Sequence, residues 1–131
     1  MGKKEIPSMD QWLREAKNDP SAASCGMYLV HNGTVRQSAR EQVRTGKQDM
    51  PPVRGMVFHV EADRVAAAIE QVRQMEGIYY VRVWLNEGEL QLGDDIMYVL
   101  VGGDIRPHVI DALQKLVGII KTECVEEKET Y

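Results

Sequence analysis

The chain has 131 residues, of which 44% are hydrophobic and 27% are charged, and its formal net charge is −4. This length is enough for one domain, residues 1–131, that buries a core without disulfides or a structural metal. The composition is that of a globular protein rather than a disordered or fibrous one. The negative charge argues against broad nucleic-acid binding, which needs a positive surface.

Neither a membrane span nor a secretory signal is expected. No apolar run approaches the roughly 20 residues that a spanning helix needs, and no apolar stretch follows Lys3 and Lys4. Cys25 and Cys124 form neither a CxxC pair nor a disulfide-rich pattern, which is consistent with a reducing compartment. The sequence therefore predicts a cytoplasmic protein that does not bind membranes.

The first predicted elements are a short helix and a strand. Ser8 can cap a helix that contains Trp12 and ends at the Asn-Asp-Pro sequence of residues 18–20. Residues 25–30 are apolar and β-prone, and a polar turn connects them to a segment that ends at Arg36. We therefore expect the first core strand to lead directly to Arg36.

A long loop is predicted next. Residues 37–52 show no sustained periodicity, contain a Pro-Pro pair and are rich in Arg, Lys and Gln. Long loops inside a compact domain are usually functional or disordered, so we expect this loop to be mobile. Basic residues outnumber acidic ones between Arg36 and Arg54, which makes this region a candidate for binding an anion. A solvated loop without a ligand is the alternative interpretation.

The second half of the chain alternates between strand and helix patterns. Residues 53–61 alternate as a strand does, and residues 63–75 place apolar side chains at helical spacing before Gly77. Residues 78–85 are aromatic and β-branched, and residues 96–101 form an apolar run typical of a strand buried on both faces. We expect two strands and one helix here, followed by another strand.

The last predicted helix begins near Pro107 and ends at Lys121. The charged residues 122–131 form a tail that can be disordered when no partner is bound. The resulting order is helix, strand, strand, helix, strand, strand, helix. It predicts an α+β fold whose largely antiparallel sheet is covered by helices on one side.

The common catalytic and metal-binding motifs are absent from the sequence. His31, His59 and His108 lie far apart without HxH or HxxxH spacing, so we predict no metal site and interpret each as a surface or core histidine. The sequence contains no GxSxG, Walker A or GxGxxG motif. These absences weigh against ordinary hydrolase and nucleotide-binding functions.

Four cations remain as candidates: Arg36, Arg106, Lys121 and Lys128. An arginine beside a helix N-terminus favours a phosphate, because its fork geometry and charge act together with the helix dipole. A lysine can become a nucleophile or a general acid when its pocket lowers its pKa. An ordinary solvent-exposed cation is the alternative for each residue.

Several segments together resemble the large subunit of molybdopterin synthase. They share turn glycines, a buried strand and basic residues at the ends of elements: 33–36 (a G-x-V-R segment), 88–90, 93–94, 96–101 and the helix between Arg106 and Lys121. The resemblance extends from Cys25 to Lys128 and is weakest over residues 37–74. It implies an α+β fold of the α/β-hammerhead type.

This resemblance implies a sulfurtransferase of molybdenum cofactor biosynthesis. In that family, precursor Z (cyclic pyranopterin monophosphate) is converted to molybdopterin by the insertion of two sulfurs, without a metal or other cofactor. The sulfur donor is a small ubiquitin-like subunit whose Gly-Gly C-terminus carries a thiocarboxylate. Two large subunits form a homodimer at the centre of a heterotetramer. The resemblance further implies that Arg36 and Arg106 bind the substrate phosphate, and that Lys121 and Lys128 are catalytic.

The sequence departs from the family pattern at two places. Ile105 stands where the family commonly has a histidine before the pocket arginine, and residues 125–127 read Val-Glu-Glu instead of Pro-x-Trp. These departures leave open a second hypothesis, a catalytically altered relative that binds a pterin or a ubiquitin-like tail. An unrelated small α+β interaction domain is the third.

Overall fold

The computed structural model describes residues 5–36 and 54–130. The predicted loop at residues 37–52 lies outside these ranges. None of the helices within them is long and apolar enough to cross a membrane.

Helices and strands alternate along the chain in the predicted manner, with additions. In chain order the elements are α1 (Met9–Lys17), the 3-10 helix η1 (Pro20–Ser24), β1 (Met27–Thr34), β2 (Gly55–Val60), α3 (Ala62–Arg73), β3 (Ile78–Leu85), β4 (Gly88–Gln91), β5 (Asp95–Gly103), α4 (Arg106–Ile119), the π-helical turn η2 (Ile120–Cys124) and β6 (Val125–Thr130). The predicted α+β class is confirmed. The two short strands β4 and β6 were not predicted from the sequence.

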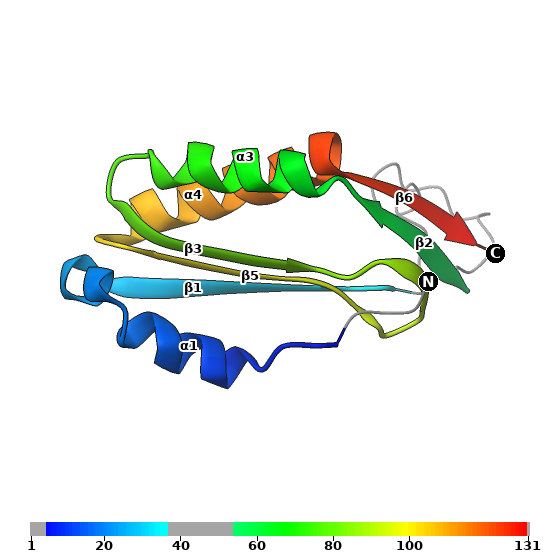
Figure 1. Cartoon of the computed structure of the whole chain (residues 1–131), viewed down its shortest axis with the longest axis horizontal. Coiled ribbons are helices and arrows are strands. Elements are labelled where there is room, and N and C mark those ends of the chain that lie inside the picture. Colours follow the sequence, from blue (N-terminus) through cyan, green and yellow to red (C-terminus); the bar gives the residue numbers. More distant parts are fainter. Residues whose placement is uncertain (1–4, 37–53, 131) are drawn as a thin grey trace.

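The strands form two antiparallel sheets. The first sheet has the order β1-β5-β3, and the second has the order β4-β2-β6. All four strand pairings are antiparallel. Figure 1 shows the first sheet running along the molecule and the second sheet at the end where β2 and β6 lie.

Helices cover both faces of the first sheet, which corrects the prediction of a single covered face. In Figure 1, α3 and α4 lie on one face and α1 lies on the other. The cause is the alternation of side chains along β5. Val99 and Val101 belong to the main core with α4, whereas Leu100 packs against Trp12 and Ala16 of α1. All three β5 residues are fully buried, so the predicted burial of this strand on both faces is confirmed.

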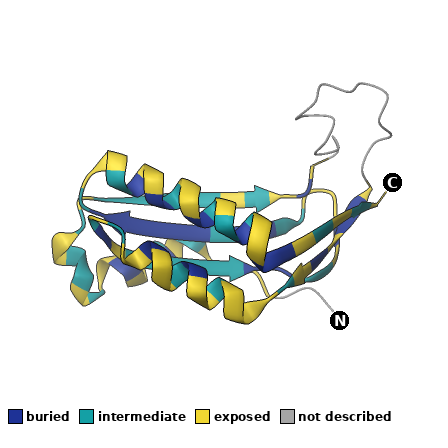
Figure 2. Ribbon diagram, turned by 90° about the horizontal axis from the view of Figure 1, so that it is seen from above, coloured by how far each residue is buried: buried dark blue, intermediate teal, exposed yellow. Residues whose placement is uncertain are grey.

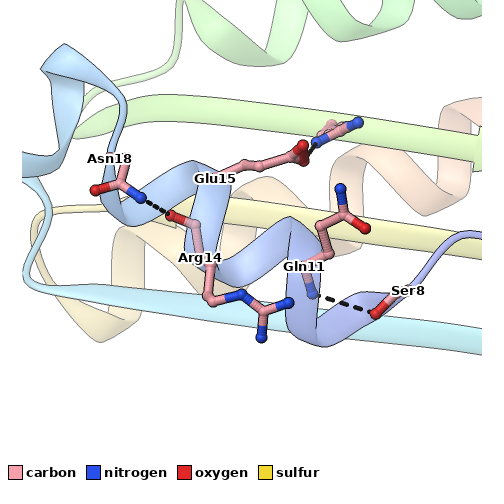
Figure 3. A network of polar contacts seen from close by, with 6 residues as sticks. Ser8, Gln11, Arg14, Glu15 and Asn18 are labelled. Atoms are coloured by element: carbon pink, nitrogen blue, oxygen red, sulfur yellow. Dashed lines mark hydrogen bonds and ion pairs between the residues drawn. The ribbon is translucent and has the colours of Figure 1, made fainter.

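The N-terminal helix is capped as the sequence predicts. The Ser8 hydroxyl accepts a hydrogen bond from the backbone N–H of Gln11 at 3.3 Å, and the Asn18 side chain donates to the Arg14 carbonyl at the other end (Figure 3). An ion pair of 2.8 Å joins Glu15 of α1 to a β3 arginine, Arg82. The caps stabilise the ends of α1, and the ion pair connects the helix to β3.

The segment after Lys121 forms an ordered element. Residues 125–130 form β6, which pairs with β2 from Val60↔Val125 to Gly55↔Thr130. The sequence did not reveal this strand, because its charged residues show no apolar alternation. The strand is held by the β2 ladder and by the burial of Cys124 and Val125 at its start. Figure 2 shows the burial pattern, with exposed and buried positions interspersed at this end of the molecule.

Candidate functional site

A pocket of about 330 Å³ opens between the end of the first sheet and the second sheet. This volume is within the range of small-molecule sites. Apolar side chains form part of its wall, and charged side chains from three separate parts of the chain form the rest. The lining residues are His31, Gly33, Thr34, Arg36, Met56, Ile96, Met97, Lys121, Glu127 and Glu129.

Lys121 reaches the pocket from the π-helical turn η2. On either side of it, Ile120 and Cys124 are fully buried and anchor the turn in the core. The Lys121 side chain itself is half-buried. Single π-helical turns are rare and occur frequently at functional sites. The widened turn thus presents Lys121 to the pocket from a fixed backbone.

Arg36 reaches the pocket from the end of β1. The preceding residue, Val35, is buried, and its backbone is tied to the β4–β5 turn: its N–H donates to Asp94 at 3.0 Å and its carbonyl accepts from Gly93 at 2.9 Å. Arg36 is exposed at the pocket. Two of the four predicted cations, Arg36 and Lys121, therefore line one pocket in a single chain.

His31 also lines this pocket, although the sequence predicted only a surface or core histidine. It shares a face of β1 with Gly33, because alternate residues of a strand point the same way. Burial lowers the pKa of His31, and the nearby positive charge of Lys121 lowers it further. Its position two residues before Gly33, the first residue of the G-x-V-R segment, was the one signal in the sequence that could have placed it at the site.

Lys128 lies on the face of β6 that points away from the pocket. Glu127 and Glu129 line the pocket, so strand alternation directs Lys128 to the opposite face. There it pairs with Val57 of β2, and both residues are exposed. The structure of one chain does not bring Lys128 together with Lys121.

Arg106 lies at the other end of α4 from Lys121. It is the first residue of the helix, and at 1.5 Å per residue the two residues are about 22 Å apart along the axis. Arg106 is exposed and does not line the pocket. Within one chain, the two predicted phosphate-binding arginines, Arg36 and Arg106, therefore lie apart.

Beside Arg106, a carboxylate and an imidazole stabilise the start of α4. The Asp104 carboxylate accepts from the Ile105 N–H at 2.6 Å and lies 2.8 Å from His108 Nδ1. The hydrogen bond and charge of Asp104 raise the pKa of His108, and His108 lowers the pKa of Asp104. Ile105, which precedes Arg106, is 52% exposed. The N-terminal end of α4 is thus held by its own side-chain pair.

The other reactive side chains show no arrangement for metal or thiol chemistry. Within residues 5–36 and 54–130, no cluster of three or more His, Cys, Asp or Glu residues could hold a metal ion. Cys25 and Cys124 are free thiols, and burial raises the pKa of both. A raised pKa keeps a thiol protonated and poorly nucleophilic.

The sequence matches the model of one protein family, described as MoaE protein, over residues 4–123. The matched range contains Arg36, Arg106 and Lys121, whereas Lys128 lies beyond it. Among curated proteins, none matches the chain.

Solved structures show the same fold. Molybdopterin synthase from Staphylococcus aureus superposes with a TM-score of 0.73 at 16% identity, over 97% of this chain and 87% of that chain. A MoaE protein from Burkholderia ambifaria MC40-6 gives 0.70 at 19% identity, over 98% and 80%. A complex of subunits 1 and 2 of molybdopterin-converting factor from Helicobacter pylori 26695 gives 0.64 at 13% identity, over 94% and 78%. At these identities the likenesses establish the fold.

The family match extends over most of the chain and includes the pocket residues Arg36 and Lys121. It rules out the third hypothesis, an unrelated interaction domain. The chain belongs to the MoaE protein family, that of the molybdopterin synthase large subunit, and has a role in molybdopterin biosynthesis.

Proposed function

We propose that the chain is the catalytic subunit of a molybdopterin synthase. It transfers sulfur from a thiocarboxylated, ubiquitin-like small subunit to precursor Z. The observation that carries this proposal is the pocket that contains both Arg36 and Lys121 in a member of this family. The solved complex of subunits 1 and 2 of the Helicobacter pylori molybdopterin-converting factor supports a small-subunit partner.

The residues of the pocket suit this chemistry. Arg36 is placed to bind the substrate phosphate, since a guanidinium binds phosphate oxygens in a bidentate manner. Lys121 is placed to stabilise developing negative charge and to protonate the oxygen that leaves when sulfur attacks. The apolar wall formed by Met56, Ile96 and Met97 can pack against the pterin rings.

Arg106 and Lys128 can act at this site only when another chain brings them to it. Arg106 lies about 22 Å along α4 from Lys121, and Lys128 faces away from the pocket. We therefore propose that a second copy supplies Arg106 to the pocket, in a homodimer at the centre of a heterotetramer. Lys128, on the outer face of β6, is placed to contact a bound partner.

The decisive test of this function is reconstitution. The chain is incubated with precursor Z and a thiocarboxylated small subunit, and molybdopterin is measured. We expect product from the wild type, and at least about a hundredfold less from Lys121→Ala because the proton donor is lost. Lys115→Ala is the matched control, because Lys115 is an exposed lysine of α4, the helix that leads into η2, and lies outside the pocket. Equal activity of the two variants would refute the role of Lys121.

A second candidate function is a binding module without turnover. The observation that favours it is the presence of Glu127 and Glu129 in the pocket, because their charges offset those of Arg36 and Lys121. This alternative predicts that precursor Z or the small subunit binds tightly while no molybdopterin forms. The reconstitution assay, run beside a binding measurement, separates the two functions.

A further inference from the structure

His31 lines the pocket and is half-buried there. It lies on β1 opposite Val99 of β5, on the face of the sheet that carries the main core. Its ring extends over Gly33: a Cβ atom at Gly33 would lie 3.8 Å from His31 Nε2. His31, Gly33 and Met97 all line the pocket, and Gly33 has no side chain that could stand between Nε2 and the pocket. Within the described residues, no hydrogen bond occupies this ring.

The charged groups around His31 come from three elements. Arg36 follows the same strand, Lys121 lies on η2, and Glu127 and Glu129 lie on β6. The Lys121 charge acts directly on the imidazole, and partial burial acts in the same direction, so both favour the neutral ring. A neutral imidazole with one free ring nitrogen is a proton acceptor near pH 7. Lys121 in the same pocket is a proton donor, so the two groups have opposite roles.

The proposed reaction needs such an acceptor. When the thiocarboxylate sulfur bonds to a substrate carbon, the carbonyl of the small subunit remains attached to that sulfur as a thioester. Release requires water to add to the carbonyl. A C–O bond then forms, the C–S bond breaks, and sulfur stays on the substrate as a thiolate. The tail leaves as a carboxylic acid, which ionises and gives its remaining proton to solvent. The proton that water loses must go to a base.

We propose that His31 is this general base, a second catalytic group of the pocket that activates water for hydrolysis of the thioester. The inference rests on the proposed sulfur transfer, because it assigns a residue to the release step. His31 takes the proton of water at Nε2 and returns it to solvent once the tail carboxylate has left.

The first arm of the test measures the imidazole itself and needs no substrate. NMR titration of the histidine ring protons is carried out on the wild type and on Lys121→Met. We expect Lys121→Met to raise the pKa of His31, because the nearby positive charge that lowers it is removed. His59 is the internal control, because it is exposed on β2 and does not line the pocket. Identical titration of His31 in both proteins would overturn the proposal.

The second arm measures the release step with a small subunit whose C-terminal glycine carries an alkyl thioester. The wild-type chain should accelerate its hydrolysis, with a rate that rises with pH through the titration of His31. His31→Gln, which cannot accept the proton, should reduce the rate about a hundredfold and abolish this pH dependence while tail binding persists. Added imidazole should restore part of the rate to His31→Ala, and His59→Gln should behave as the wild type.

The outcomes separate this inference from the proposed function. Wild-type hydrolysis rates in His31→Gln overturn the role of His31, and so does a wild-type chain that does not accelerate the hydrolysis. After either result, the precursor Z assay with Lys121→Ala still tests the proposed sulfur transfer independently. Loss of thioester hydrolysis in His31→Gln, with restoration by imidazole, supports the base.

Discussion

At the residue scale, the surroundings of a titratable side chain decide the direction in which its pKa shifts. His31 and His108 have the same intrinsic chemistry but opposite pKa shifts. Burial and Lys121 lower the pKa of His31, whereas the hydrogen bond to Asp104 raises the pKa of His108. The surroundings in the pocket thus favour the neutral form of His31, whereas those at the start of α4 favour the protonated form of His108.

The Asp104–His108 pair predicts a pH-dependent contribution to stability. The raised pKa of His108 stabilises the fold below pH ~6.5, and this contribution is lost as the pH rises through the folded-state pKa. The lowered pKa of Asp104 stabilises the fold above pH ~3.8 and is lost as the pH falls through its folded-state pKa. Asp104→Asn should therefore lower the pKa of His108 measured by NMR, with its largest stability loss between these limits in urea unfolding. An unchanged His108 titration would show that the pair does not form.

At the element scale, the sequence predicted the elements with a strong local signal. Ser8, the aromatic and β-branched residues of β3 and the apolar run of β5 each express a local preference, and their positions are confirmed. The strand β6 has no such signal, since its pairing with β2 decides its structure. Lys128, which lies on this strand, was predicted from the spacing of the family motif alone. Such spacing does not reveal which face of a strand a residue occupies.

Two of the turns between elements each depend on a glycine in a left-handed conformation. Gly77 joins α3 to β3 with φ +77°, and Gly93 joins β4 to β5 with φ +84°. A Cβ atom at Gly77 would overlap the Asp104 carboxylate and His108, whereas a Cβ at Gly93 would meet nothing within 4 Å.

Alanine at these two positions separates backbone strain from steric overlap. Gly93→Ala should cost about 1–2 kcal/mol in free energy of unfolding, from the backbone conformation alone. Gly77→Ala should cost more, because Asp104 and His108 must also move. Urea unfolding of both variants measures the difference. Equal losses would mean that the side-chain pair at α4 adapts without cost.

At the scale of the whole molecule, the two ends of α4 serve different surfaces. The pocket with Arg36 and Lys121 lies at one end, and Arg106 lies at the other. One chain therefore cannot bring both arginines to one phosphate. The family resemblance implied that both residues bind the substrate phosphate, without stating from which copy each comes.

Mixed dimers test whether two copies share a site. Arg106→Ala and Lys121→Ala are each expected to be inactive as homodimers. In a mixed dimer, one pocket regains both residues, so about half of the wild-type sites become active after statistical correction for subunit mixing. Molybdopterin formation by the refolded mixture measures this complementation. Absence of activity in the mixture would contradict a site that two copies share, and full activity of the Arg106→Ala homodimer would exclude Arg106 from the site.

The central claim is that Arg36 and Lys121 act on one substrate in one pocket, with separate tasks. A single-turnover assay with precursor Z and the thiocarboxylated small subunit tests it most directly, over a range of precursor Z concentrations. Arg36→Ala should require at least about tenfold more precursor Z, equivalent to about 1.4 kcal/mol of binding, and keep a substantial maximal rate. Lys121→Ala should have a strongly reduced maximal rate that no concentration of precursor Z restores. The same concentration dependence and maximal rate as the wild type in either variant would contradict the account.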